Sequence, residues 1–390
     1  MTAHAYLSAS GAYRWLICTP SAKLGAQFDD VPSAYAAEGS FAHAVAELRL
    51  KKYLGLIKTK AFNAQRKLQE GSQYYSAEMA DYIEGYVAVV AERISQAQTR
   101  SSDAIILLEQ RLDFSEWVPQ GFGTGDVVII ADGILDVIDL KYGKGVPVSA
   151  VDNPQMRLYG LGALSQFEML YDIQAVRMTI IQPRLDSISE EDMPVDELVK
   201  WAEDYLKPRA EMAIKGEGDF CAGEHCKFCK ARFVCKARAD YNMELAKHDF
   251  CDSFLLTHDD IADVLARADN LAAWVSDIKE YALQQALDGV KFPGWKLVSG
   301  RSNRKYSDDC EVAEILVKAD YPEEKIYKPS ELLGITAMEK ELGKKRFNEL
   351  LAGLLVKPPG KPTLVPESDK RPEISSTDSA KTDFQQGGQD

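Results

Sequence analysis

The sequence lacks an excess of positive charge and any long hydrophobic run. Lys and Arg number 46 against 60 Asp and Glu, which gives a formal net charge of −14. Contact with nucleic acid would therefore depend on a local basic patch and not on the field of the whole protein. No apolar stretch approaches the roughly 20 residues that span a bilayer, and no signal-peptide pattern is visible. We therefore expect a cytoplasmic protein without a membrane partner.

At 390 residues, 46% of them hydrophobic, the chain is long enough for more than one domain. We expect a main domain over residues 1–250 and a mainly helical accessory region over 255–355. The accessory region begins with a long helix over 258–288 and contains an aromatic and basic hairpin over 292–306. Beyond it, residues 357–390 are rich in Pro, Ser, Gly, Asp and Gln, which predicts a disordered tail.

Two apolar runs on either side of a turn signal predict a hairpin in the middle of the main domain. Residues 127–131 and 134–140 read as strands, and Asp132-Gly133 reads as the turn between them. Asp126 opens the first strand and Asp139 closes the second. Lys141 shares a face with Asp139, because side chains two residues apart in a strand point the same way. Two carboxylates and an ammonium group at one strand end suit a hard divalent cation, although Asp139 and Lys141 alone would make an ordinary ion pair.

The flanking patterns predict a mixed α/β fold. A helix that begins near residue 38 carries His43 and Glu47 on one face, and a second helix covers 76–98. A strand over 104–112 leads into the hairpin. A helix after Asn153 then carries Gln155 and Tyr159 one turn apart. A strand over 175–181 and an acidic amphipathic helix over 193–214 follow.

Clustered cysteines predict a metal or iron–sulfur site. Cys226 and Cys229 form a C-x2-C pair, and Cys235 follows after five intervening residues. Cys221 would complete a local zinc site with four thiolates, and His225 is a further candidate ligand. The same segment has five basic residues and no acid between positions 226 and 238, interleaved with Phe residues. It is predicted to contact a DNA backbone, unless it is only a solvated face: Lys227, Lys230, Arg232, Lys236 and Arg238.

Together these motifs resemble a known family. Gly123-x-Gly-Asp126, Ile138-Asp139-Leu-Lys141 and Gln155-x3-Tyr159, with His43 in a preceding helix, are similar to the RecB-type branch of the PD-(D/E)XK nucleases. The three late cysteines and the distant Cys18 resemble the iron–sulfur members, which include CRISPR-associated adaptation nucleases and the AddB nuclease domain. The resemblance covers about residues 8–240. It implies a restriction-endonuclease-like core, a mixed central sheet flanked by helices, with an iron–sulfur segment at 221–238.

The resemblance also implies roles for individual residues. His43, Asp126, Asp139 and the main-chain carbonyl of Leu140 would hold Mg²⁺ or Mn²⁺. Lys141 would orient the attacking water or stabilise the charged transition state, and Gln155 and Tyr159 would contact substrate or brace the lysine. A [4Fe–4S] cluster would be held by Cys18, Cys226, Cys229 and Cys235, with Cys221 as the alternative ligand and structural Zn²⁺ as the alternative metal.

The expected activity is therefore that of a Mg²⁺- or Mn²⁺-dependent deoxyribonuclease. We expect an exonuclease that processes DNA ends in phage recombination, repair or replication, in the host cytoplasm if the chain is phage-encoded. A phage single-strand-binding or annealing protein would be a partner. The alternative is a non-catalytic module that retains the fold and cluster and binds DNA ends or a recombinase. A role in CRISPR adaptation is a third reading, against which the extra region at 255–355 counts.

Overall fold

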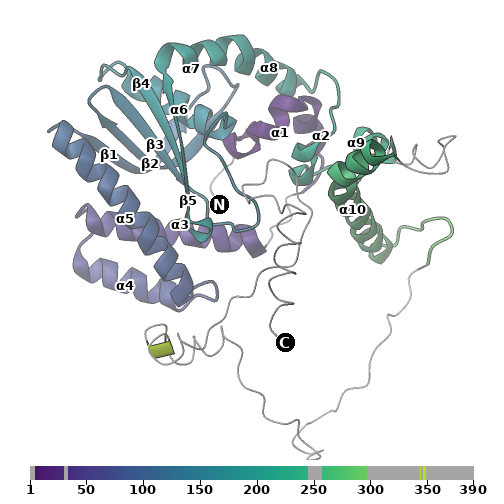
Figure 1. Cartoon of the computed structure of the whole chain (residues 1–390), viewed down its shortest axis with the longest axis horizontal. Coiled ribbons are helices and arrows are strands. Elements are labelled where there is room, and N and C mark those ends of the chain that lie inside the picture. Colours follow the sequence, from purple (N-terminus) through teal and green to yellow (C-terminus); the bar gives the residue numbers. More distant parts are fainter. Residues whose placement is uncertain (1–4, 30–33, 245–256, 297–342, 344–345, 348–390) are drawn as a thin grey trace, which may run out of the picture. The chain divides into compact units, whose positions relative to one another are not determined.

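The computed structural model (Figure 1) describes residues 5–29, 34–244, 257–296, 343 and 346–347. Contacts divide the chain into two units, Met1–Val290 and Lys291–Asp390. The long helix α10 (His258–Leu287), predicted over 258–288, is confirmed, and it belongs to the first unit and not to the accessory region. Most of the predicted hairpin at 292–306, the later helices and the tail at 357–390 lie outside the described residues.

A five-stranded mixed sheet forms the centre of the first unit. Its strands lie in the order of the sequence: β1 (Ile105–Asp113), β2 (Phe122–Ala131), β3 (Ile134–Leu140), β4 (Ala175–Gln182) and β5 (Ser187–Pro194). All neighbouring strands are antiparallel except β3 and β4, which are parallel. The predicted hairpin and its turn at Asp132-Gly133 are confirmed, and so is the mixed α/β fold class.

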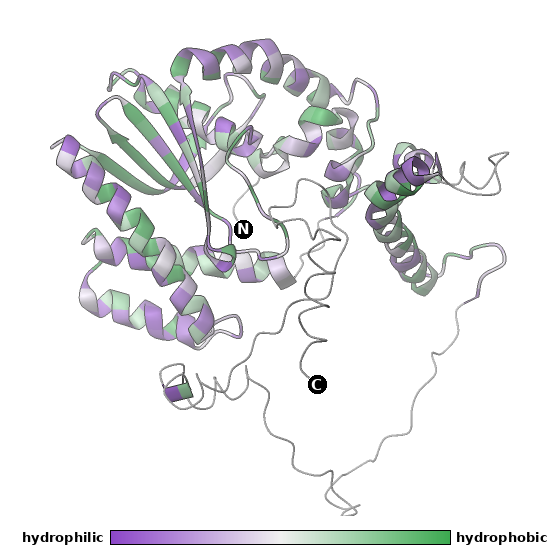
Figure 2. Cartoon of the chain, in the orientation of Figure 1, coloured by the Kyte–Doolittle hydropathy of each residue, from purple (hydrophilic) through white to green (hydrophobic). Residues whose placement is uncertain are grey.

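Helices cover both faces of the sheet. On one face, α3 (Ala34–Tyr53) and α5 (Ala77–Arg100) pack on side chains that include Val127, Ile129 and Ile138. On the other face, α6 (Pro154–Phe167) packs on Val128, Leu135 and Val137. Figure 2 shows the inner strands as mostly hydrophobic, as expected for a sheet that is buried on both faces.

The helix α6 connects the parallel strands β3 and β4, which need a crossover of this kind. It begins where the Asn153 side chain accepts hydrogen bonds from two backbone N–H groups, with Pro154 at the first helical position. Gly162 lets the helix approach β1 closely, because a Cβ there would lie 3.1 Å from the carbonyl carbon of Leu112. Nine consecutive residues of α6 are buried, Met156 to Leu164. This fixes the side chains of its first turns over the sheet.

The helix predicted over 193–214 begins too early, and the edge strand before it was not predicted. Residues Ser187–Pro194 form β5, and the helical part that follows consists of α7 (Val195–Trp201), a π-helical turn at Ala202–Leu206 and α8 (Lys207–Lys215). Along β5 exposed and half-buried residues alternate, as is typical of an edge strand.

Shorter helices complete the first unit. At the N-terminal end lie a 3₁₀ turn (Ala9–Gly11), α1 (Ala12–Ile17) and α2 (Pro20–Gly25), and α4 (Thr59–Glu70) lies between α3 and α5. Two more 3₁₀ turns (Pro183–Leu185 and Glu224–Phe228) and α9 (Lys236–Met243) follow the sheet strands. Among the described helices, none combines the length and the apolar character that crossing a bilayer requires.

Candidate functional site

Strands β2 and β3 separate at the end where Asp126 lies. Their last paired residues at this end are Val127 and Ile138. Beyond this pair, the backbone N–H of Leu140 donates to Oδ2 of Asp126 at 2.7 Å, so a side chain replaces the missing ladder bond. The carboxylate is thereby fixed between the two strands. As predicted, Asp126 and Asp139 lie close enough at this end that Asp126 contributes to the raised pKa of Asp139.

His43 of α3 completes the first half of the site. Its Nδ1 lies 2.9 Å from Oδ1 of Asp126. Burial favours the neutral imidazole, but the carboxylate of Asp126 outweighs it and raises the pKa of His43 to about 9. A metal ion binds the neutral imidazole, so binding at this position would release a proton.

Glu109 is a third member of this group that the sequence did not reveal. One ligand atom from each of Glu109, His43 and Asp126 lies within 4.8 Å of the others. Glu109 has a left-handed φ of 49°, although its neighbours Leu108 and Gln110 keep their pairing with β2. Burial, and then repulsion by Asp126 and Glu47, raise the pKa of Glu109 to about 7. The signal in the sequence was only an acid directly after the apolar run Ile105–Leu108.

These residues have the chemistry of a divalent-cation site. One imidazole and two carboxylates suit a transition metal or Mn²⁺, and the carboxylates also suit Mg²⁺. The small cavity that they line also contains Tyr86, whose buried hydroxyl makes no hydrogen bond with a described residue. The imidazole, the two carboxylates and the unsatisfied Tyr86 hydroxyl are all groups that favour a bound cation.

Asp139, Lys141, Gln155 and Tyr159 form a second, adjoining network. Lys141 Nζ lies 2.8 Å from Oδ2 of Asp139 and donates to Oε1 of Gln155 at 3.0 Å. The amide nitrogen of Gln155 donates to Oδ1 of Asp139 at 3.3 Å and to the Tyr159 hydroxyl at 3.2 Å. Burial raises the pKa of Asp139, and the ammonium of Lys141 opposes that effect. The predicted residues therefore do meet, with Gln155 as the link between them.

The predicted metal ligands thus divide between two groups. His43 and Asp126 lie together, whereas Asp139 binds Lys141 and Gln155 and is not part of the compact group with Glu109. Leu140 contributes its backbone N–H to Asp126. Gly123 lies under the ring of Tyr159, where a Cβ would come within 2.6 Å of Cε1, so this glycine makes room for the tyrosine.

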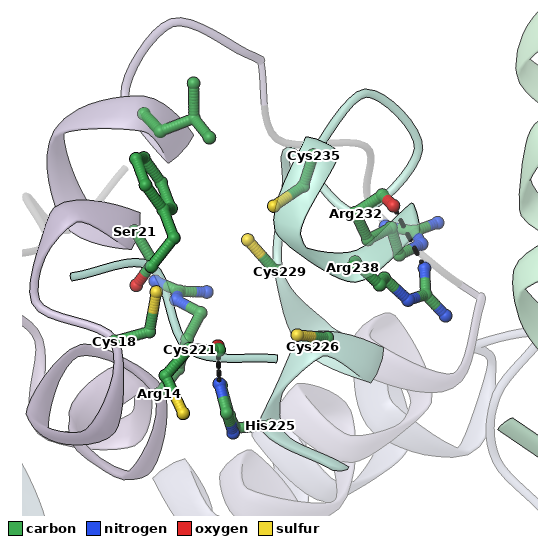
Figure 3. A pocket seen from close by; sticks show the side chains of 12 residues that line it. Arg14, Cys18, Ser21, Cys221, His225, Cys226, Cys229, Arg232, Cys235 and Arg238 are labelled. Carbon is green, nitrogen blue, oxygen red and sulfur yellow. Dashed lines mark hydrogen bonds between the residues drawn. The ribbon is translucent and has the colours of Figure 1, made fainter. Parts of the chain in front are cut away.

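A separate pocket brings the cysteines together (Figure 3). It is lined by thiols from both ends of the folded unit: Cys18, Cys221, Cys226, Cys229 and Cys235. Figure 3 shows the sulfurs of four of them turned toward the space between α1–α2 and the 224–236 segment, while the sulfur of Cys221 points away. Cys221 is also exposed, whereas Cys18, Cys226 and Cys229 are buried. The Nε2–H of His225 donates to the carbonyl oxygen of Cys221 at 2.8 Å.

The two sides of this pocket are joined by hydrogen bonds. Arg14 of α1 donates to the carbonyl oxygen of Phe228 at 3.0 Å. Thr19 donates to the carbonyl oxygen of Glu217 at 2.5 Å, and Arg209 donates to that of Leu16 at 2.6 Å. Burial raises the pKa of the Cys229 thiol, and the Arg14 guanidinium opposes this. A bound metal would favour the thiolate form of such a group.

Two of the predicted DNA-contacting residues contact the helix α10. Arg238 is 5% exposed and donates to Asp277 of α10 at 2.6 Å, and Arg232 donates to the same carboxylate at 3.1 Å. Phe233 stacks on Tyr281 of the same helix, with ring centroids 4.5 Å apart. Arg232 and Arg238 thus both pair with Asp277 of α10, and their contact with DNA stays a prediction. Lys236 pairs with Asp240, and Lys227 lies over the Phe228 ring.

Comparison with known proteins places the chain in a family. The family model described as "Protein of unknown function (DUF2800)" matches residues 4–372. The chain belongs to the DUF2800 family. Because this match runs through the sheet, the cysteine pocket and α10, the whole first unit is part of what defines DUF2800.

One solved structure similar to this DUF2800 protein is the crystal structure of SSO0001. The match has 18% sequence identity and a TM-score of 0.22, and it covers 49% of this chain and 81% of that chain.

Proposed function

We propose that this DUF2800 protein is a metal-dependent deoxyribonuclease of the RecB-type PD-(D/E)XK class. The observation that carries the proposal is the hydrogen-bonded set of Asp139, Lys141, Gln155 and Tyr159 beside the compact group of His43, Glu109 and Asp126. A buried carboxylate paired with a lysine, next to a cation site, suits the hydrolysis of a phosphodiester.

In this proposal His43, Asp126 and Glu109 would hold Mg²⁺ or Mn²⁺, with Asp139 and the Leu140 carbonyl next to them. The bound cation would supply positive charge to the scissile phosphate. Asp126 is held between the strands by the N–H of Leu140, so its carboxylate is preorganised.

Lys141 is the residue that would act on the reacting phosphate. Its ammonium group is half-buried and is positioned by Asp139 on one side and Gln155 on the other. A cation fixed in a partly dry site stabilises the extra negative charge of the transition state more strongly than a mobile one. Gln155 also bonds Tyr159, so the helix α6 sets the position of the lysine through two side chains.

For the cysteine pocket we propose a [4Fe–4S] cluster held by Cys18, Cys226, Cys229 and Cys235. Cys18, Cys226 and Cys229 are buried and face the pocket together with Cys235, whereas Cys221 is exposed and points away. This arrangement supports the set that includes Cys18, which the resemblance to iron–sulfur nucleases implies, over the local zinc site that includes Cys221.

The activity is tested with the purified, cluster-loaded full chain on end-labelled single- and double-stranded DNA. We expect nucleotide release with Mg²⁺ or Mn²⁺, and loss of at least about 100-fold in Asp139→Ala and Lys141→Ala. Lys200→Ala, on the exposed face of α7, is the matched control and should retain activity. Absence of cleavage of either DNA form with either metal would overturn the proposal. If DNA binding remained in that case, the result would favour the non-catalytic module that holds DNA ends or a recombinase.

The setting of the activity is part of the same proposal. We propose end processing by an exonuclease in phage recombination, repair or replication, in the host cytoplasm, with a single-strand-binding or annealing protein as partner. Release of mononucleotides from one labelled end, against internal cuts, would distinguish exonuclease from endonuclease action.

A further inference from the structure

A second concentration of positive charge in the sheet-containing unit lies outside the cysteine segment, on α3 and α4. Between Leu48 and Gln69 the sequence has seven basic residues and no acidic one, in a chain of net charge −14. The helix α4 has no buried residue, and Lys58, Lys60, Arg66 and Lys67 are exposed. Figure 2 shows α4 as mostly hydrophilic. We call this surface, formed by the end of α3 and by α4, the α3–α4 basic surface.

The helix α4 lies antiparallel to α3 and leads back to the candidate site. At one end Lys52 donates to the hydroxyl of Thr59 at 2.8 Å, and at the other end Gln69 donates to the carbonyl oxygen of Ala44 at 2.9 Å. Ala44 is the neighbour of His43, which contacts Asp126. Arg66 and Lys67 therefore lie within one helical turn of Gln69, which contacts α3 at the residue next to His43. The basic residues of α4 thus extend along α3 toward the candidate site.

Part of this charge is balanced locally and part is not. Lys51 pairs with Glu47, which lines the same cavity as His43, and Arg66 pairs with Glu70. Lys58, Lys60 and Lys67 make no ion pair with a described residue. Two exposed ammonium groups on α4 and a third at its N-cap are thus without an ion pair to a described carboxylate. Such a surface favours a polyanion over an acidic side chain of the same protein.

We infer that the α3–α4 basic surface binds the phosphate backbone of the DNA strand whose end enters the site. This inference rests on the proposed function. The ten residue steps from Thr59 to Gln69 span about 15 Å at 1.5 Å per step, which corresponds to about four nucleotide steps at 3.4 Å each. A backbone that follows α4 toward Gln69 would thus make several phosphate contacts before its end reaches His43. The contacts are to phosphate and carry no sequence preference.

The test measures DNA binding by fluorescence anisotropy across a series of salt concentrations. It uses the full chain with Asp139→Ala and no added divalent metal, so that binding is separated from cleavage. One variant carries Lys60→Glu and Lys67→Glu on α4. The matched control carries Lys200→Glu and Lys215→Glu, two exposed lysines on α7 and α8. Both variants change the net charge by the same amount, and circular dichroism checks that both fold.

We expect the α4 variant to bind DNA at least about ten-fold more weakly and to lower the salt slope of log Kd by about 2, since each phosphate contact contributes about 0.9. The control should change neither by more than the shared effect of net charge. Equal losses in the two variants, or no loss in either, would overturn the inference. So would binding of the α4 surface to anionic lipid vesicles with no affinity for DNA. If no metal supports cleavage but the α4 variant alone loses binding, the proposed activity fails while this inference stands.

Discussion

The side-chain oxygen of Gln155 accepts a hydrogen bond from Lys141 Nζ at 3.0 Å, and the amide nitrogen of the same Gln155 donates to Asp139. One amide on α6 thus contacts both members of the Asp139–Lys141 ion pair on the sheet. Because an amide has a donor end and an acceptor end, it matches a carboxylate and an ammonium at once. Neither a carboxylate nor a second ammonium at position 155 would do so.

The first prediction is that Gln155 positions Lys141. We expect Gln155→Ala to lower kcat about 10- to 100-fold, the loss of a hydrogen bond to a charged group, with a smaller change in KM. Gln155→Glu should also lose activity, because its carboxylate would attract Lys141 but repel Asp139. Steady-state kinetics on labelled DNA measure both. Unchanged kcat in Gln155→Ala would show that the lysine does not need this contact.

The second prediction concerns Glu109. We expect Glu109→Gln to weaken Mn²⁺ binding about ten-fold or more, because a charged ligand is replaced by a neutral one. Isothermal titration calorimetry of the free protein measures this without an activity assay. Glu116→Gln, an exposed position between β1 and β2, is the control and should leave the affinity unchanged. Equal Mn²⁺ affinity in the wild type and Glu109→Gln would remove Glu109 from the site.

The third prediction separates Cys18 from Cys221. The thiol of Cys18 faces the other three cysteines of the pocket, whereas that of Cys221 is exposed and points away. We expect Cys18→Ala to lose iron and the brown absorbance, and Cys221→Ala to keep both. Iron analysis and absorbance spectra of the two proteins, purified without oxygen, provide the measurement. Full cluster content in Cys18→Ala would instead favour the local set that includes Cys221.

The fourth prediction concerns stability and pH. Asp136 is 7% exposed, and burial raises its pKa from 3.8 to about 6, against the opposing effects of Arg93 and Arg177. The folded state therefore holds this proton more tightly than the unfolded state, so stability is lost as pH rises from about 4 to about 6. A difference of about 2 pKa units corresponds to about 3 kcal/mol at most.

Replacement by Asn removes that dependence. We expect the unfolding free energy of Asp136→Asn, relative to wild type, to rise by up to about 3 kcal/mol between about pH 4 and about pH 7. Urea unfolding at several pH values measures it. Asp113→Asn is a control of opposite sign, since hydrogen bonds from Ser115 lower the pKa of Asp113. A constant difference between Asp136→Asn and wild type across this range would contradict the prediction.

The elements that the sequence predicted are those with a strong local signal. The hairpin of β2 and β3 has two apolar runs and an Asp-Gly turn, and α6 has Asn and Pro at its start. The strand β3 and the start of α6 were predicted at the observed residues, whereas β2 begins at Phe122, five residues before the predicted start. The strand β5 has no such signal, because its residues Ser, Glu and Asp have low strand propensity and it is held by pairing with β4. That pairing is a tertiary effect.

The site residues that share a face of a regular strand or helix could be predicted from their spacing. The residue that lies at an irregular backbone position could not. Asp139 and Lys141 share a strand face, and Gln155 and Tyr159 share a helix face, so their meeting followed from periodicity. Glu109 reaches the site through a left-handed backbone position that no pattern indicates. The ion pairs of Arg232 and Arg238 with Asp277 were not predicted, because Asp277 is some forty residues further along the chain.

The separation of Cys18 from Cys235 has a consequence for synthesis of the protein. Of the four thiols that face the pocket, one comes from the first helices and three come from the segment after the sheet. Cys235 follows Cys18 by 217 residues in the sequence. A ribosome that adds about 5 to 20 residues per second takes about 10 to 40 seconds to cover that distance. During this interval the Cys18 thiol is without its partners and open to oxidation. For the cluster proposed above, low oxygen and ample iron during expression would therefore matter most before Cys235 has been made.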